Sequence, residues 1–164
     1  MTEIPNPVRQ ERCAPARLDA TDRSLLALLA EDGAMSYADL GAAVHLSAPA
    51  VHERVKRLRR DGVIRATVAR LDGCKLGRPL LTFVLVDTRD IASTRRLAGL
   101  AALPEVEEIH TVAGDSCVML KIRAADTEGL EELLGRVQEI EGVTGTRSYI
   151  ALSTFTERGP SPLP

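Results

Sequence analysis

The densest group of side chains that could do chemistry lies between residues 52 and 70. Only Glu53 and Asp61 oppose the basic residues there, so the net charge is +5 over 19 positions. The basic residues are Arg54, Lys56, Arg57, Arg59, Arg60, Arg65 and Arg70. Such a concentration is typical of a surface that binds a polyanion. A solvated helix face gives the same counts, so charge alone leaves both interpretations open.

The two halves of the chain carry opposite net charge. Residues 1–79 hold 13 Lys and Arg against 10 Asp and Glu, whereas residues 80–164 hold 8 against 13. Net charges of +3 and −5 therefore underlie the total of −2. Polyanion binding belongs to the first half, and the second half needs another role.

The spacing of apolar residues predicts three short helices in residues 18–62. The first begins at Asp19 or Thr21 and the second at Ser36, residue types that cap helix N-termini. The third begins at Ser47, accepts Pro49 in its first turn and ends at Gly62. The positions expected to face inward are Leu25, Leu28, Leu29, Tyr37, Leu40, Ala43, Val44, Val51, Val55 and Leu58. Because a tight turn at His45-Leu46 joins the last two helices, the pattern predicts a helix-turn-helix.

The third helix has the dimensions and side chains of a DNA reader. An α-helix fits the major groove of B-DNA, and residues near its N-terminus reach base edges. Arg54 or Arg57 can grip a guanine, Glu53 can accept from a cytosine, and His52 can donate to a purine. Ala50 can touch a thymine methyl group, while the later basic residues and the helix N-terminus suit phosphates. The predicted DNA-binding residues are Ser47, Pro49, Ala50, His52, Glu53, Arg54, Lys56, Arg57 and Arg60.

The second half predicts a different architecture. Strands are expected at Leu80–Thr88, Val106–Ala113, Cys117–Arg123 and Val143–Ser153, and helices at Ile91–Leu103 and from Asp126 to Gly142. This βαββαβ order is that of ferredoxin-like domains. A further strand at Val63–Leu71 would form the wing and linker of the first half. The chain is therefore expected to be α+β, with a flexible tail in residues 1–17, a winged helix-turn-helix in 18–79, a ferredoxin-like domain in 80–154 and a C-terminal tail in 155–164.

One face of this predicted sheet has no helix to cover it. RNA-binding sheets present aromatic rings there, but the central strands offer Phe83 alone. We therefore expect the face to pack against a second copy of the chain. A two-fold dimer would also set two recognition helices about 34–36 Å apart, one turn of duplex.

Motifs along most of the chain resemble the Lrp/AsnC (leucine-responsive and asparagine) family of transcription regulators. The resemblance covers residues 18–154, and the order of its motifs is specific. The matching residues are Leu18-Asp19-Ala20-Thr21-Asp22-Arg23, Leu25-Leu26, Leu40, Val44, Leu46-Ser47, Val51, Glu53-Arg54-Val55-Lys56-Arg57-Leu58, Gly62-Val63-Ile64, Leu76-Gly77, Val112-Ala113-Gly114-Asp115, Gly142-Val143 and Thr146-Arg147-Ser148.

That resemblance implies a prokaryotic, sequence-specific regulator whose helix-turn-helix binds promoter DNA. The second domain of the family, called the RAM domain, dimerises through its sheet and often builds octamers from four dimers. A small effector, usually an amino acid, binds between RAM domains and alters assembly or DNA affinity. Turn N–H groups and hydroxyls suit the carboxylate of such a ligand, and Asp115, Glu131 or Glu132 suits its ammonium. Carried over by position, the effector site comprises Gly114, Asp115, Ser116, Cys117, Thr146 and Ser148.

Two departures from the family pattern stand out. Family members often carry an aromatic residue and then an acid after the Gly-Asp pair, where this chain has Ser116 and Cys117. The missing acid argues against leucine or asparagine as the ligand. His45 stands where the family often has glycine, and a histidine takes the left-handed backbone conformation only at a small cost.

The composition also bears on other classes of protein. Three scattered cysteines, Cys13, Cys74 and Cys117, fit a reducing cytoplasm and predict neither a disulfide framework nor a zinc site. No apolar run approaches the ~18 residues of a membrane span, and no cofactor is expected. An enzyme would pair Cys117 with His110, without an evident third group to orient them. A nucleoid-type architectural protein, which binds DNA with little sequence choice and no effector, remains the main alternative.

Overall fold

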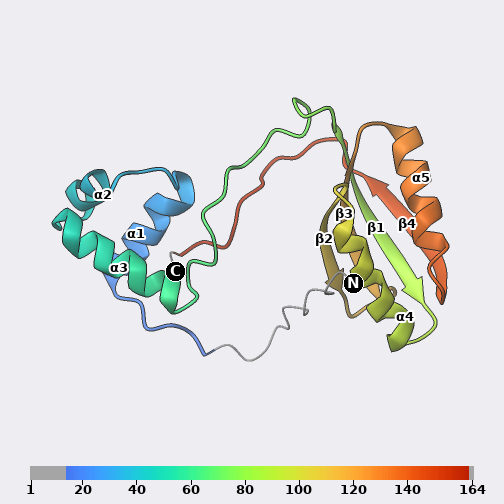
Figure 1. Cartoon of the computed structure of the whole chain (residues 1–164), viewed down its shortest axis with the longest axis horizontal. Helices are drawn as coiled ribbons and strands as arrows, with labels where there is room; N and C mark the ends of the chain where they lie inside the picture. The colour runs from blue at the N-terminus through green and yellow to red at the C-terminus, as the bar shows by residue number, and fades with distance from the viewer. Residues whose placement is uncertain (1–13, 163–164) are drawn as a thin grey trace. The chain divides into compact units, whose positions relative to one another are not determined.

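The computed structural model describes residues 14–162, so most of the tail predicted for residues 1–17 lies outside the described residues. Two compact units divide the described chain (Figure 1). Residues 14–70 and 156–162 form a helical unit, and Leu71–Phe155 form a unit built on a sheet. Each unit has its own core.

The helical unit contains the three expected helices, α1 (Ala20–Glu31), α2 (Tyr37–Val44) and α3 (Ala48–Arg60). Asp19 caps α1 in a reciprocal capping box with Asp22, and Ser36 caps α2 by accepting from the backbone N–H of Asp39. The core holds Leu25, Leu40, Val51, Val55 and Leu58, as the periodicity predicts. Ala43, which was expected to face inward, is exposed. It lies at the edge of the apolar stripe, where Leu40 and Val44 already fill the contact with the core.

The turn between α2 and α3 is tight. His45 has φ 57° and ψ 43°, the left-handed conformation expected for it. The N–H of Leu46 donates to the carbonyl of Gly41, and a Cβ on Gly41 would lie only 2.4 Å from the carbonyl oxygen of Leu46. The absence of a side chain at residue 41 therefore lets α2 and the turn approach each other. Ser47 is the N-cap of α3, although its side chain makes no capping hydrogen bond.

The strand predicted at Val63–Leu71 does not form, and that prediction is wrong. Gly62 has a φ of 71° and ends α3, and Val63 and Ile64 fold back by donating to the carbonyl of Leu58. Residues 65–70 are irregular and exposed, with Val68 at 77% of its surface in solvent. A β-branched segment needs a neighbouring backbone to form a ladder, and no strand pairs with this one in the described chain.

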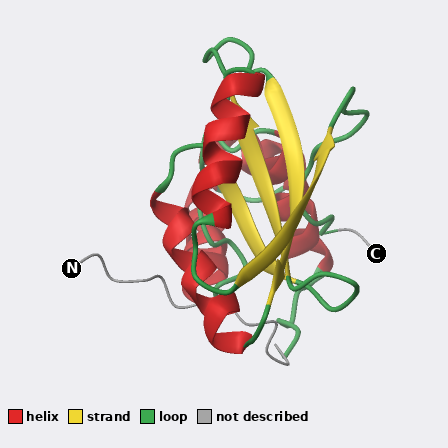
Figure 2. Cartoon of the chain, turned by 90° about the vertical axis from the view of Figure 1, so that its right-hand side faces the viewer, coloured by secondary structure: helices red, strands yellow, loops and turns green. Residues whose placement is uncertain are grey.

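The sheet unit has the predicted βαββαβ order. Its elements are β1 (Leu80–Thr88), α4 (Ile91–Arg96), a 3₁₀ helix η1 (Leu97–Ala102), β2 (Val106–Thr111), β3 (Val118–Ala124), α5 (Thr127–Gln138) and β4 (Val143–Ile150). The strands are antiparallel in the order β2-β3-β1-β4 (Figure 2). Both β2 and β4 end two or three residues before their predicted limits. The fold class and the order of the elements along the chain thus follow the expectation.

One face of this sheet is packed against the helices of the unit, and the other is partly exposed. Val84, Val86, Val118, Leu120 and Ile122 lie on the face packed against the helices and belong to the core. On the other face Phe83 lies between Lys121 and Tyr149 of the neighbouring strands, and Tyr149 has 56% of its surface exposed. Among the described residues, no helix is long and apolar enough to cross a membrane.

Candidate nucleic-acid interface

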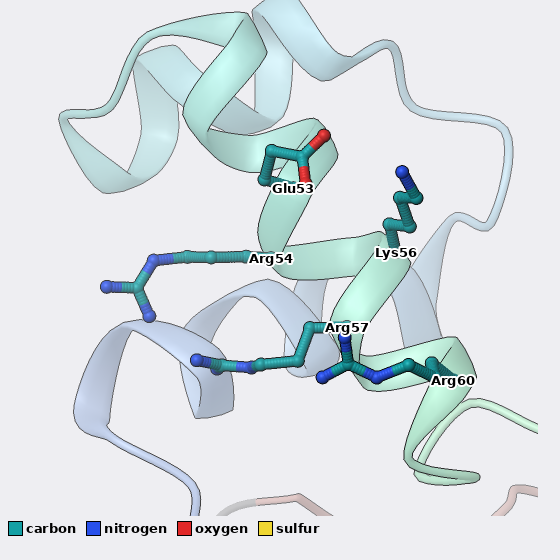
Figure 3. Close-up of a pocket in the computed structure, with 5 residues that line it drawn as sticks. All are labelled: Glu53, Arg54, Lys56, Arg57 and Arg60. Carbon is teal, nitrogen blue, oxygen red and sulfur yellow. The ribbon is translucent and has the colours of Figure 1, made fainter.

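The buried stripe of α3 decides which of its side chains reach solvent. Val51, Val55 and Leu58 lie in or against the core of the helical unit, so the intervening positions line the outer surface. A hollow of about 600 Å³ lies on this side of the helix (Figure 3). It is lined by Glu53, Arg54, Lys56, Arg57 and Arg60. Five of the predicted DNA-binding residues therefore lie side by side.

Within this group, Arg54 and Arg57 have partners on α1. Asp22 is buried with 1% of its surface exposed, and it accepts from Nη1 of Arg54 at 2.9 Å and from Nη2 of Arg57 at 2.5 Å. Arg54 Nη1 also donates to Oδ2 of Asp19 at 2.6 Å. Figure 3 shows both guanidinium groups directed toward α1, away from Glu53 and Lys56.

These ion pairs shift the titration of their exposed members. The hydrogen bond from Arg54 lowers the pKa of Asp19 below its ordinary value, and the backbone N–H of Asp22 lowers it further. The same carboxylates raise the pKa of Arg54, Asp19 first and then Asp22. The charged forms of Asp19 and Arg54 are therefore favoured in the folded unit.

The other predicted DNA-binding residues lie on the outward side of α3 or in its first turn. His52, Glu53, Lys56 and Arg60 are exposed. The ring of His52 lies 5.4 Å from that of Tyr37 on α2, which holds it beside the first turn. Ser47 and Pro49 are exposed and Ala50 is half-buried. Arg60 contacts Asp61 at the C-terminal end of the helix.

The residues predicted for an effector site lie around one end of the sheet. Ser116 is buried, and its hydroxyl accepts from Nη2 of Arg147 at 2.5 Å; Arg147 also lies 3.5 Å from Asp87. Oδ1 of Asp87 is shielded from solvent and has no hydrogen bond. The structure thus assembles a carboxylate, a guanidinium and a hydroxyl beside the turn at residues 114–116.

Thr146 and Ser148 are not part of that cluster. Side chains alternate along a strand, so these two lie on the face of β4 opposite to Arg147. Thr146 accepts a hydrogen bond from Gln138 of α5 at 3.0 Å. The structure therefore separates the two groups of residues that sequence position had placed in one site.

The geometry does not assemble the Cys117–His110 pair. His110 lies 2.7 Å from Glu108, while Sγ of Cys117 contacts the carbonyl of Thr88. Hydrogen bonding to Thr88 lowers the pKa of the Cys117 thiol, and His110 is bonded to Glu108 and not to this thiol. In residues 14–162 no group of three or more His, Cys, Asp and Glu is placed to hold a metal ion.

Sequence reasoning missed Asp22, Asp87 and Arg147. Asp22 stands three residues after Asp19, a spacing that indicates a capping box and could have been found. The burial of Asp22 under α3 could not be predicted from the sequence, because it depends on how the two helices pack. Asp87 stands next to last in the apolar strand Leu80–Thr88, where sequence alone indicates no partner for it, and Arg147 appears only within a family motif.

Three helices with an exposed basic recognition helix, joined to an antiparallel sheet unit with the βαββαβ order, define a class of protein. It is a helix-turn-helix DNA-binding regulator with a separate sensor domain. Comparison with known proteins gives the family. The AsnC-type helix-turn-helix domain matches residues 18–59, and the Lrp/AsnC ligand binding domain matches residues 82–161.

Similar proteins occur in archaea and bacteria. The HTH-type transcriptional regulator FL11 of Pyrococcus horikoshii is 32% identical over 89% of this chain and 97% of its own length. The leucine-responsive regulatory protein of Haemophilus influenzae is 36% identical, over 88% and 89%. The crystal structure of the leucine response regulatory protein LrpA of Mycobacterium tuberculosis has a TM-score of 0.76 and 35% identity, over 88% of this chain and all of that one.

The chain belongs to the Lrp/AsnC family of transcription regulators. It is a transcriptional regulator with a DNA-binding helix-turn-helix and an effector-binding domain, and the fold and the relatives are those of regulators, not enzymes.

Proposed function

We propose that this regulator recognises a specific DNA sequence and that a free α-amino acid changes its DNA affinity or its assembly. The observation that carries the first part is the outward surface of α3, where His52, Glu53, Lys56 and Arg60 are exposed. Glu53 supports sequence choice in particular, because a carboxylate repels phosphate and gains only from a base donor such as the cytosine amino group.

Measured affinities for selected and random DNA test the first part. A preferred duplex is isolated from a randomised pool, and its Kd is compared with that of a scrambled duplex at the same salt. We expect the preferred duplex to bind at least ~10³-fold more tightly. Similar Kd values for both would favour the nucleoid-type alternative, in which the chain coats DNA without choosing a sequence.

The second part is supported by the polar groups beside the turn at residues 114–116. Asp87 and Arg147 offer opposite charges, and Ser116 adds a hydroxyl, a set that suits the ammonium and carboxylate of a zwitterion. Asp87 provides an acid in the region where Cys117 replaces the family's usual one. The proposed effector site therefore comprises Gly114, Asp115, Ser116 and Cys117 with Asp87 and Arg147, and Thr146 and Ser148 stay as expectations from the family.

A thermal-shift screen of the twenty amino acids identifies the ligand, because a ligand that binds the native state raises Tm.

The variant Gly114→Trp then tests where the ligand binds. A Cβ at residue 114 meets nothing within 4 Å, so a side chain can leave the backbone there without an immediate clash. We expect the variant to lose the ligand-induced shift. Gly135→Trp on α5, at an equally open glycine, is the matched control and should keep the shift. An unchanged response in Gly114→Trp would rule out this position.

We further propose that two copies pair through the open sheet face around Phe83 and Tyr149 and act on DNA in the cytoplasm. Exposed aromatic side chains on neighbouring strands support this, because their burial drives association. Assembly of four dimers into an octamer is the family expectation. Light scattering gives the number of subunits, and Phe83→Lys should reduce it; a wild-type monomer would contradict the pairing.

A further inference from the structure

The two central arginines of α3 are held by the helical unit itself. We propose that Asp22, Arg54 and Arg57 are positioning residues that fix the recognition helix on α1, and that DNA is contacted by the side chains directed away from α1. Arg54 and Arg57 reach different oxygens of one buried carboxylate, at 2.9 Å and 2.5 Å. This assignment goes beyond the proposed function and rests on it only for the identity of the ligand, duplex DNA.

Burial of Asp22 is the first reason for the assignment. An ionised carboxylate with 1% exposure is costly unless it is paired, and removing one partner leaves an uncompensated charge. An arginine that rotated outward to bind a phosphate would therefore lose a charge-assisted hydrogen bond. It would also leave the buried carboxylate of Asp22 with one partner fewer, which is unfavourable. The N-terminal end of the α1 dipole adds to the attraction at Asp22 but cannot replace both arginines.

Geometry is the second reason. Arg54 and Arg57 are three residues apart on α3, so their side chains leave the same face about one turn apart. Both converge on the first turn of α1, and Arg54 also reaches Asp19 at 2.6 Å. Two ion pairs along one helix restrict its rotation and direction together with the packing of its buried stripe. The exposed side chains of α3, Lys56 among them, are thereby presented at a constant angle.

The salt dependence of DNA binding separates this assignment from direct DNA contact. Arg57→Gln and Lys56→Gln remove the same charge from adjacent positions of one helix, one directed toward α1 and one away from it. Each phosphate contact contributes about 0.9 to the slope of log Kobs against log salt. We expect Lys56→Gln to lower the slope by about 0.9 and Arg57→Gln to leave it unchanged, with the full-length protein on a random-sequence duplex.

Thermal melting supplies the second measurement. Arg57→Gln should lower Tm by about 4 °C or more, whereas Lys56→Gln should leave Tm unchanged. The double variant Asp22→Asn with Arg57→Gln should lose less than the sum of the two single losses, because neither partner is then left uncompensated. If Arg57→Gln alone does not fold, the double variant takes its place in the salt titration, again with an unchanged slope expected.

A lower slope in Arg57→Gln, equal to that of Lys56→Gln and with Tm preserved, would overturn the assignment and make Arg57 a DNA contact. Additive losses of Tm would also overturn it. If the wild-type chain bound neither random nor selected duplexes at low salt, the proposed function would fail. The melting experiment would still decide whether Asp22 fixes α3.

Discussion

Two buried polar side chains of this molecule differ in whether they have hydrogen-bond partners. Asp22 receives hydrogen bonds from two arginines and from the backbone of Asp19. Thr82 in β1 is fully buried, and its hydroxyl has no partner. A buried polar group without a hydrogen bond costs about 1–3 kcal/mol, whereas a paired one contributes to specific packing. The two residues therefore predict opposite effects of substitution.

Thr82→Val should stabilise the sheet unit by about 1 kcal/mol, since it replaces an unpaired hydroxyl by a methyl group of similar size. Urea denaturation followed by circular dichroism measures the change. Thr88→Val is the control, because the hydroxyl of Thr88 is bonded to that of Thr94 at 2.6 Å and its loss should destabilise the unit. A loss of stability in Thr82→Val would show that this hydroxyl has a partner in solution.

Stability of the helical unit should fall as the pH is lowered below about 4. Arg54 lowers the pKa of Asp19 in the folded unit, so the unfolded chain binds the proton first. The contribution is complete above the ordinary pKa of aspartate and is lost as the pH falls through the lowered value. Asp19→Asn keeps a capping side chain and should flatten this dependence, measured by melts at several pH values. Asp126→Asn, at the cap of α5, should leave the acid slope of the helical unit unchanged.

At the scale of the elements, the α2–α3 turn leaves no room for an added side chain at Gly41. Gly41→Ala should destabilise the helical unit by about 1–3 kcal/mol, because the new Cβ would lie 2.4 Å from the backbone oxygen of Leu46. Denaturant titration gives the value. Gly135→Ala in α5, where a Cβ meets nothing within 4 Å, should instead stabilise by about 0.5–1 kcal/mol. Equal effects at the two positions would contradict the close approach at Gly41.

Periodicity predicted most elements because local apolar spacing and packing agree in them. Val51, Val55 and Leu58 recur at helical intervals along α3 and are buried, and the alternation along β3 matches its two faces. The strand prediction at Val63–Leu71 was wrong, because a β-branched composition does not supply a second strand to pair with. The outward face of α3 was equally predictable from Val51, Val55 and Leu58. The contact of Arg54 and Arg57 with Asp22 could not be predicted, because residue spacing within one helix carries no information about the helix packed against it.

At the scale of the whole molecule, two hydrophobic cores predict two unfolding events. Val84 and Leu120 belong to one core and Leu25 and Val55 to the other, and the two clusters share no residue. We expect calorimetry to resolve two transitions. Gly41→Ala should move only one of them and Thr82→Val only the other. A single transition shifted by both variants would show that the units unfold together.

Some residues of α3 bond the carboxylate of Asp22, and others are exposed on the outer surface. This separation of roles matters for engineering new DNA preferences. In the assignment we propose, Asp22, Arg54 and Arg57 position the helix, whereas Pro49, His52, Glu53 and Lys56 are exposed. New operator preferences can therefore be sought by randomising those four positions alone, in a library whose members all keep the parent scaffold. Retargeting the protein and keeping it folded become separate problems.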